Sequence, residues 1–143
     1  MQIRTKYHGE ISVNRSEVFV FKQGIPAFLE EENFVFLPLS DDGIYFIMQS
    51  VKTPELAFLV ISPFTFFKEY DFMIEDSIVS ELSINAEEDI LVYSILTVED
   101  PFEKTTANLQ APIVVNTKNR TGKQVILHNE IFGTKHRIFQ YTK

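Results

Sequence analysis

The chain has 143 residues and a formal net charge of −7 at pH 7, with 14 Phe, 5 Tyr, no Trp and no Cys. This length fits one domain with a sizeable core, and the missing cysteines exclude disulfides and thiolate metal sites. The acidic balance argues against direct nucleic-acid binding, which depends on Lys and Arg neutralising phosphates. No apolar run approaches the roughly 18 residues that a membrane span needs, and no signal-peptide core follows the start. We therefore expect a soluble, intracellular single domain over residues 1–143.

Short runs of alternating, β-branched or aromatic residues follow one another along most of the chain, which is the pattern of an all-β domain. Residues with turn chemistry separate these runs. The predicted strands are, in chain order, Gln2–Tyr7, Glu10–Val13, Glu17–Phe21, Phe34–Leu37, Ile44–Ser50, Leu56–Ile61, Ile90–Val98, Ile113–Val115, Gln124–Leu127 and Arg137–Tyr141. The longest continuous run is the seventh, which we expect to be a central strand.

One stretch departs from the strand period. Its apolar residues at helical spacing are Ile74, Ile78, Val79 and Leu82. This spacing predicts a short helix at 76–82, and Asp76 or Ser77 can cap its first turn. Pro63–Tyr70, which contains three Phe, fits either a loop that packs inward or a helical turn.

Turns at 52–54 and 119–122 predict two hairpins, which join the fifth strand to the sixth and the eighth to the ninth. Strands in series with one or two short helices indicate a mainly β domain. We expect an antiparallel sheet closed into a barrel-like or sandwich fold, because closure limits exposed sheet edges.

No residue pattern indicates catalysis, a cofactor or a metal. His8, His128 and His136 lie far apart in the sequence, and none has metal-ligand spacing with another His. The carboxylates occur in loop clusters without a partner that would raise the pKa of one relative to another. The five glycines form no phosphate-binding loop. The sequence therefore predicts a non-enzymatic protein without cofactors.

Aromatic residues outside the predicted strands suggest a binding surface instead. These residues are Phe28, Phe64, Phe66, Phe67, Phe72 and Phe102, and each lies near Pro or acidic residues. Any one of them can anchor a loop to the core, but we do not expect all six to be anchors. Since exposed apolar patches mark partner sites, we infer at least one apolar recognition patch with an acidic rim. The acidic clusters are otherwise solvated loops, or contacts for a basic partner.

The stretch Thr106–Asn116 is unusual because small and polar residues precede an apolar run. Pro112 lacks an N–H group for a sheet ladder, so it belongs at the start, edge or bulge of a strand. Asn108 and Asn116 can bond to neighbouring backbone groups that the sheet leaves unpaired. These properties indicate that the stretch serves to start a strand rather than to contact a partner.

Three segments together resemble the FliW family of flagellar assembly factors. They are GIPAF at 24–28, MQS at 48–50 with AFLVISPF at 57–64, and TANLQAPIVVN at 106–116 with the GKQVIL that follows. The residues that carry the motif are Gly24, Pro26, Phe28, Gln49, Ser50, Pro63, Thr106, Asn108, Leu109, Ala111, Pro112 and Asn116. Ala27 stands where the family usually has Gly. We therefore expect an ordinary β or α conformation at Ala27 and a special one at Gly24.

The resemblance implies a cytoplasmic, non-enzymatic protein that is monomeric alone and has two competing partners. One is CsrA, an RNA-binding translational repressor of flagellin mRNA, and the other is flagellin before its export. Acidic residues suit the basic partner CsrA, whereas an apolar groove suits the amphipathic helices of flagellin.

We select candidate contact residues for CsrA from loops that combine aromatic side chains with carboxylates, and those for flagellin from Phe102 and the surface around Asn108–Pro112. The candidates for CsrA are Glu30, Glu31, Glu32, Phe64, Phe66, Phe67, Glu69, Tyr70, Asp71, Glu75 and Asp76. The candidates for flagellin are Phe102, Asn108, Leu109 and Pro112. The alternative hypothesis is a small β-barrel whose Phe-rich interior binds an apolar or aromatic ligand.

Overall fold

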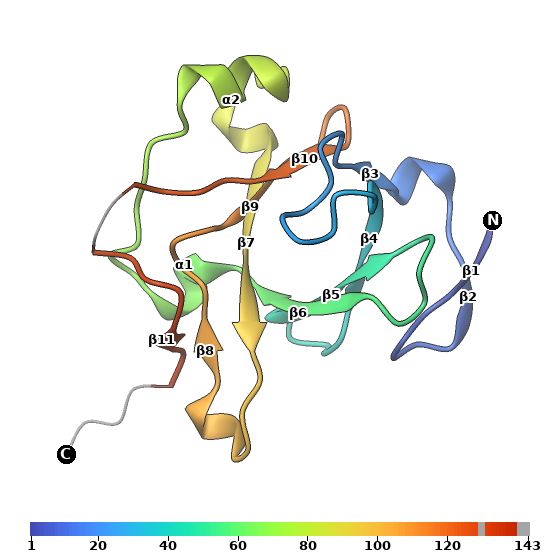
Figure 1. The fold of residues 1–143 in the computed structure, drawn as a ribbon, viewed down its shortest axis with the longest axis horizontal. Coiled ribbons are helices and arrows are strands. Elements are labelled where there is room, and N and C mark those ends of the chain that lie inside the picture. The colour runs from blue at the N-terminus through green and yellow to red at the C-terminus, as the bar shows by residue number, and fades with distance from the viewer. Residues whose placement is uncertain (129–130, 140–143) are drawn as a thin grey trace.

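The fold is a closed β-barrel, seen here in a computed structural model that describes residues 1–128 and 131–139 (Figure 1). Seven strands pair in the order β7-β6-β5-β4-β3-β10-β9, and β9 pairs with β7 to close the ring. Their bounds are β3 Phe19–Val20, β4 Asn33–Pro38, β5 Tyr45–Ser50, β6 Ala57–Ile61, β7 Ile90–Thr97, β9 Ile113–Asn116 and β10 Thr121–Gln124. Six of the seven pairings are antiparallel, and β3 pairs with β10 in parallel.

Smaller elements extend or cover the barrel. The hairpin β1–β2 forms a separate two-stranded sheet, and β8 and β11 continue the main sheet beyond β7. The bounds are β1 Gln2–Arg4, β2 Glu10–Ser12, β8 Thr106–Ala107, β11 His136–Arg137, α1 Pro63–Phe66 and α2 Asp76–Glu81. Three single turns of 3-10 helix are η1 Arg15–Glu17, η2 Glu87–Asp89 and η3 Phe102–Lys104.

The predicted mainly β fold with short helices is confirmed, and several boundaries differ. The third strand is shorter than predicted because Glu17 ends η1, where its Oε1 accepts the Asn14 N–H at 3.0 Å. The second strand of the last hairpin begins at Thr121, three residues before the predicted start. The predicted strand Arg137–Tyr141 overlaps β11 only at its first residue, and its last two residues lie outside the described part.

The two helical predictions have different outcomes. The helix predicted at 76–82 is present as α2. Its N-cap residue is Glu75, and the helix has no capping hydrogen bond from a side chain. The prediction that Asp76 or Ser77 caps it is therefore wrong, because the helix starts one residue earlier than that assignment requires. In Pro63–Tyr70 the helical turn occurs over the first four residues as α1.

The core has two large layers, one on each side of the barrel wall, and a smaller cluster that joins Ile3 and Val13 to Val35 of β4. The interior is filled by fully buried side chains from neighbouring strands and from Phe21, which directly follows β3. The strand residues among them are Phe34, Met48, Val60, Ile113 and Val115. In the second layer, α2, the residues after α1 and the C-terminal segment pack against the outer face of the barrel. The buried members of this layer are Ile61, Tyr70, Ile78, Leu82, Leu96, Ala107, Leu109, Val114, Val125, Leu127 and Ile138. Because its own side chains fill the barrel interior, the ligand-barrel alternative finds no support in this packing.

The turn Ile25–Phe28 corrects the expectation for Ala27. Phe28 N–H donates to Ile25 C=O at 2.6 Å, and Ile25 N–H donates to Phe28 C=O at 3.3 Å. With Pro26 at its second position, such a turn takes a positive φ at its third, where Gly is usual. Ala27 accordingly has φ 75°, so the expected ordinary conformation is wrong. Gly24 does have a special conformation, with φ 66°, and a Cβ at this position would lie 2.6 Å from Leu29 Cα.

We predict that Ala27→Gly stabilises the fold. An L-residue in this region is strained by about 1–2 kcal/mol, and Gly adds about 0.4–1 kcal/mol of freedom to the unfolded chain. The free energy of unfolding in urea should therefore rise by about 0.5–1 kcal/mol. Ala57, which lies in strand β6, is the matched control: Ala57→Gly should lower the free energy of unfolding by about 0.5–1 kcal/mol. Equal losses in both variants would contradict the strain at Ala27.

Candidate protein-binding surface

The segment that follows β6 places a row of aromatic side chains on the outer face of the barrel. Pro63 occupies the first position of α1, where its missing N–H is not needed. Phe67 N–H donates to Pro63 C=O at 2.8 Å, and Tyr70 N–H donates to Phe67 C=O at 3.0 Å. The chain thus turns twice within eight residues, which sets Phe66, Phe67 and Tyr70 beside the C-terminal segment.

Asn108 shapes the turn that meets this segment. Its Oδ1 accepts the N–H groups of Gln110 at 3.1 Å and Ala111 at 3.0 Å. The Leu109 carbonyl then accepts the Tyr70 hydroxyl at 2.7 Å in a buried hydrogen bond. Burial raises the pKa of Tyr70, which keeps this donor protonated. The structure thus brings together two segments predicted as contacts for different partners.

These segments and the residues before β11 form a concave surface, which we call the aromatic groove. Its volume is about 530 Å³. Its lining residues are Phe66, Phe67, Lys68, Glu69, Tyr70, Leu109, Ile131, Phe132 and His136. The Tyr70 and Phe132 rings are 4.7 Å apart between centroids and T-shaped, and Phe67 meets the His136 ring at 6.2 Å. The groove is therefore apolar at its base, with charged side chains at its margin.

The wall opposite α1 is held by Gly133. Its carbonyl accepts the N–H groups of Leu109 and Gln110, both at 3.1 Å. Its own N–H donates to His136 Nε2 at 2.7 Å. The groove is consequently fixed on both sides by backbone hydrogen bonds.

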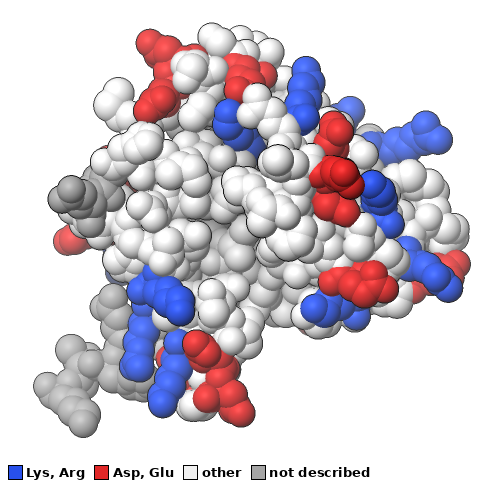
Figure 2. Space-filling model, viewed as in Figure 1, with Lys and Arg blue, Asp and Glu red and all other residues white. Residues whose placement is uncertain are grey.

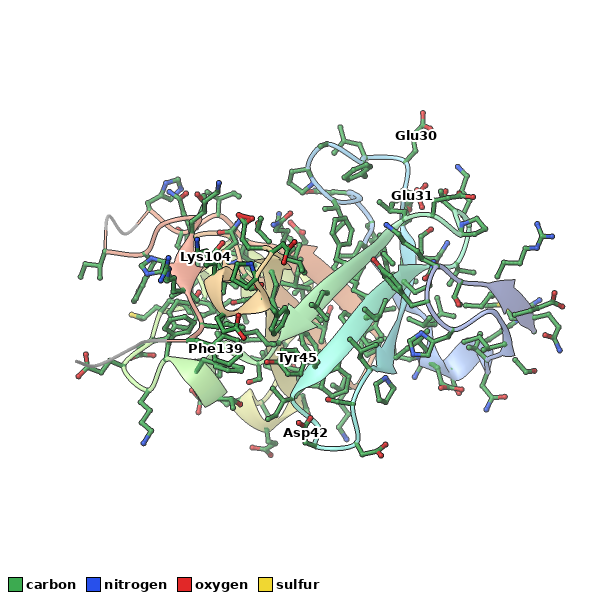
Figure 3. The ribbon with its side chains drawn as sticks, turned by 90° about the horizontal axis from the view of Figure 1, so that it is seen from below. Glu30, Glu31, Asp42, Tyr45, Lys104 and Phe139 are labelled. Carbon is green, nitrogen blue, oxygen red and sulfur yellow. The ribbon has the colours of Figure 1, made fainter. Side chains whose placement is uncertain are left out.

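Four rings continue the groove towards β5 and η3. Tyr45, Phe66, Phe102 and Phe139 contact one another in a closed circuit, with Phe66 shared by the groove. Figure 3 labels two of them, Tyr45 and Phe139. The centroid distances are 6.3 Å for Tyr45–Phe66, 6.0 Å for Tyr45–Phe102, 5.8 Å for Phe102–Phe139 and 6.2 Å for Phe66–Phe139. Burial, together with the carboxylate of Asp42, raises the pKa of Tyr45. Phe102 remains exposed, so this cluster reaches the surface.

Acidic side chains border the apolar surface along residues 64–75. A hollow of about 240 Å³ lies between Phe64, Phe72 and the start of β7, with Asp71 and Glu87 in its lining. A third hollow, of about 180 Å³, has Glu75 in its lining beside Met73, whose side chain is 89% exposed. In Figure 2 the middle of the visible face carries few charges, and charged side chains gather around its edge. These charged side chains are of both signs, and the predicted recognition patch with an acidic rim stays a prediction.

The acidic residues at 30–32 belong to a different part of the molecule. Glu31 accepts the hydroxyls of Ser50 and Thr53, both at 2.5 Å, and so joins the turn between β5 and β6. Burial opposes ionisation of Glu31, but these two hydrogen bonds and the charge of Lys52 lower its pKa overall. The five residues of β6 separate this turn from α1 by roughly 15 Å. The candidates for CsrA therefore form two groups, as Figure 3 shows for Glu30 and Glu31.

Most family-motif residues are parts of the fold. The buried Gln49 amide donates to carbonyls of the β5–β6 turn, including Ser50 at 3.0 Å and Pro54 at 3.1 Å, and its Oε1 accepts the Lys6 N–H at 3.0 Å. Of the flagellin candidates, Leu109 and Pro112 are buried and the Asn108 side chain holds its turn. Only Phe102 among them is exposed.

Sequence reasoning missed the residues that complete this surface. Tyr45 and Phe139 lie in predicted strands, which gave no sign of a binding role, and Phe132 and His136 lie outside every predicted element. The only local signal was an aromatic residue next to a glycine at 132–133. These side chains join the site through tertiary packing, which no local pattern reports.

The described residues offer no alternative site for metal chemistry. Within residues 1–128 and 131–139, no group of three or more His, Cys, Asp or Glu side chains could hold a metal ion. The same residues contain no helix that is both long and apolar enough to cross a membrane.

Comparisons with known proteins point to one family. A family model described as FliW protein matches residues 2–138. The chain is 52% identical over 139 residues to a flagellar assembly factor FliW of Geobacillus kaustophilus (97% of this chain, 96% of the relative). It is 50% identical over 138 residues to the factor of the same name from Bacillus subtilis (96% of each). A crystal structure of the flagellar assembly factor FliW superposes with a TM-score of 0.95 and 49% identity, covering 100% of both chains.

We predict that Tyr70→Phe makes the free energy of unfolding less dependent on pH in the alkaline range, and that it also removes a hydrogen bond. The raised pKa of Tyr70 means that the folded state keeps its proton while the unfolded state loses it above pH of about 10. Stability is therefore complete below that pH and falls as pH rises. In the variant this fall should be shallower by up to about 1.4 kcal/mol per pH unit. At pH 7 the variant should lose about 1–3 kcal/mol, because the Leu109 carbonyl stays buried without its donor.

Urea unfolding measured from about pH 7 to about pH 11, roughly one unit above the ordinary tyrosine pKa, follows both effects. Tyr7, which is 56% exposed, provides the control for the same chemical change. Tyr7→Phe should leave the neutral-pH stability unchanged. Identical curves for Tyr70→Phe and the wild type would rule out the proposed role of the hydroxyl.

Proposed function

The chain belongs to the FliW family, and from this we propose that it is a cytoplasmic flagellar assembly factor without enzymatic activity. In this proposal it binds the translational repressor CsrA, which relieves repression of flagellin mRNA. It also binds flagellin before export, as a chaperone-like partner. The two partners compete, so accumulating flagellin releases CsrA and translation stops.

The observation that carries this proposal is a shared surface. Phe102, a candidate for flagellin, connects through Phe139 to Phe66, a candidate for CsrA. Phe66 in turn lines the groove whose base is Leu109 and whose margin is Glu69. Two proteins that use this continuous surface would exclude each other, and their concentrations would decide which one is bound. Such a switch needs no conformational change in the chain itself.

The chemistry of the surface suits both partners. Flagellin would place the apolar face of an amphipathic helix along the groove, with Phe66, Phe67 and Phe132 as its walls. CsrA, whose RNA-binding surface is basic, would approach the carboxylates of Glu69 and Asp71. Both carboxylates are exposed, and neither forms an ion pair with any residue that the structure describes.

The separation of the two acidic groups makes the CsrA contact testable. Glu69→Lys with Asp71→Lys should weaken CsrA binding by at least about tenfold and make it less sensitive to salt, because attraction becomes repulsion. Glu30→Lys with Glu32→Lys changes the net charge equally at the other group and should leave the affinity within about threefold. Calorimetric titration at two salt concentrations measures both. A larger loss in the second variant would move the CsrA site to the loop at 30–32.

Competition is the direct test of the function. Flagellin added to a preformed complex of this protein with fluorescently labelled CsrA should displace CsrA, and the apparent Kd for CsrA should rise in proportion to free flagellin. Fluorescence anisotropy follows the release, and serum albumin at equal concentration serves as the control. CsrA that stays bound at saturating flagellin would disprove mutual exclusion, and a chain that binds neither protein would disprove the function itself.

A further inference from the structure

A hollow of about 420 Å³ lies at the end of the barrel near β3, and it shares no lining residue with the aromatic groove. The turn between β9 and β10 and the 3-10 turn η1 flank β3 there (Figure 1). Two arginines, Arg15 on η1 and Arg120 on the β9–β10 turn, line the hollow. The proposed function uses neither of them.

The charge of this hollow is opposite to that of the protein. The chain has 20 acidic and 13 basic residues, yet no Asp or Glu lines the hollow, and two of the four arginines do. Neither guanidinium forms a hydrogen bond or an ion pair with any residue among 1–128 and 131–139. The ion pair in these residues joins Lys123 to Glu81, and neither of these two lines the hollow. Asn33, also in the lining, has a side-chain amide without a partner in the same residues. Three unused donor groups therefore border one concave surface.

Three valines that form the floor of the hollow fix the backbone around these donors. Val18 N–H donates to Arg15 C=O at 3.2 Å, Val20 N–H to Arg120 C=O at 2.8 Å, and Val51 N–H to Asn33 C=O at 3.0 Å. All three valines line the hollow. Each polar residue is thus tied by one hydrogen bond to a valine of the floor, which orders the backbone before any ligand arrives.

The turn that carries Arg120 is held independently. Asn119 Nδ2 donates to Leu82 C=O at 2.9 Å, and its Oδ1 accepts the Thr121 hydroxyl at 2.7 Å. Arg120 itself has φ 55°, a conformation that a side chain other than Gly adopts only where its surroundings impose it. The position of this arginine is consequently set by the fold and not by local preference.

We propose that this hollow binds a small oxyanion, a phosphoryl or carboxylate group carried on an apolar body. Planar guanidinium groups match the geometry of both anions and give charge-assisted hydrogen bonds. The Asn33 amide supplies a further N–H donor. The floor of Val18, Val20 and Val51 accommodates the apolar part. This ligand is distinct from the protein partners proposed above, and its site is separate from theirs.

Titration with phenyl phosphate, phenylacetate, inorganic phosphate and benzyl alcohol, followed by amide chemical shifts, tests the proposal. Phenyl phosphate or phenylacetate should bind saturably and at least about tenfold more tightly than inorganic phosphate, because only they use the apolar floor. Benzyl alcohol, which lacks the charge, should not bind. Shifts should be confined to residues around Arg15, Asn33 and Arg120. The difference between phenyl phosphate and phenylacetate identifies the preferred oxyanion.

The four arginines of the chain provide a matched pair of variants. Arg15→Gln with Arg120→Gln should weaken binding of the preferred anion by at least about tenfold. Arg4→Gln with Arg137→Gln removes the same charge from two exposed positions on β1 and β11 and should leave binding unchanged. Thermal unfolding confirms that both variants fold. Equal losses in the two variants, or no saturable binding by either aromatic anion, would overturn the site.

Discussion

Closure of the barrel depends on β9, whose four residues are all buried. Ile113 and Val115 point into the barrel interior, while Val114 belongs to the outer layer. Each such side chain contributes roughly 1.5–3 kcal/mol when it leaves water. The strand pairs with β7 on one side and β10 on the other, so it completes the ring of hydrogen bonds. A strand with this role has no solvent face, which explains the apolar run of its first three residues, Ile113–Val115.

The residues on either side of β9 connect that closure to the rest of the molecule. Pro112 has no N–H to donate, and its carbonyl accepts the Val125 N–H at 2.9 Å. At the other end, Asn116 Nδ2 donates to the carbonyls of Leu82 at 2.9 Å and Ser83 at 3.2 Å, which fixes the end of α2. The turn at Asn108 precedes the strand and sets the base of the aromatic groove. The proposed binding surface therefore includes the turn that leads into the strand that closes the barrel.

The sequence predicted the fold well where a local pattern decides the structure. The hairpin β5–β6, the central strand β7 and α2 follow from alternation, turn residues and helical spacing. Ala27 was misjudged because its φ is imposed by the two hydrogen bonds between Ile25 and Phe28, which overrule the preference of alanine. The order of strands, the parallel pairing of β3 with β10 and the contact of Tyr70 with Leu109 join residues far apart in the chain. No local pattern contains that information.

The residues that mark this chain as a family member differ from those that would contact a partner, because the first group holds the fold together. Gln49, Asn108 and Asn116 use their side-chain hydrogen bonds on backbone groups of the fold. Substituting any of them would disturb the barrel and its surface together, so a loss of binding in such a variant would say nothing about contact. Glu69 and Arg15 instead are exposed and without ion pairs in the described part of the chain. Side chains of this kind can be changed without removing a bond that holds the fold, so they are the positions at which contact and stability can be told apart.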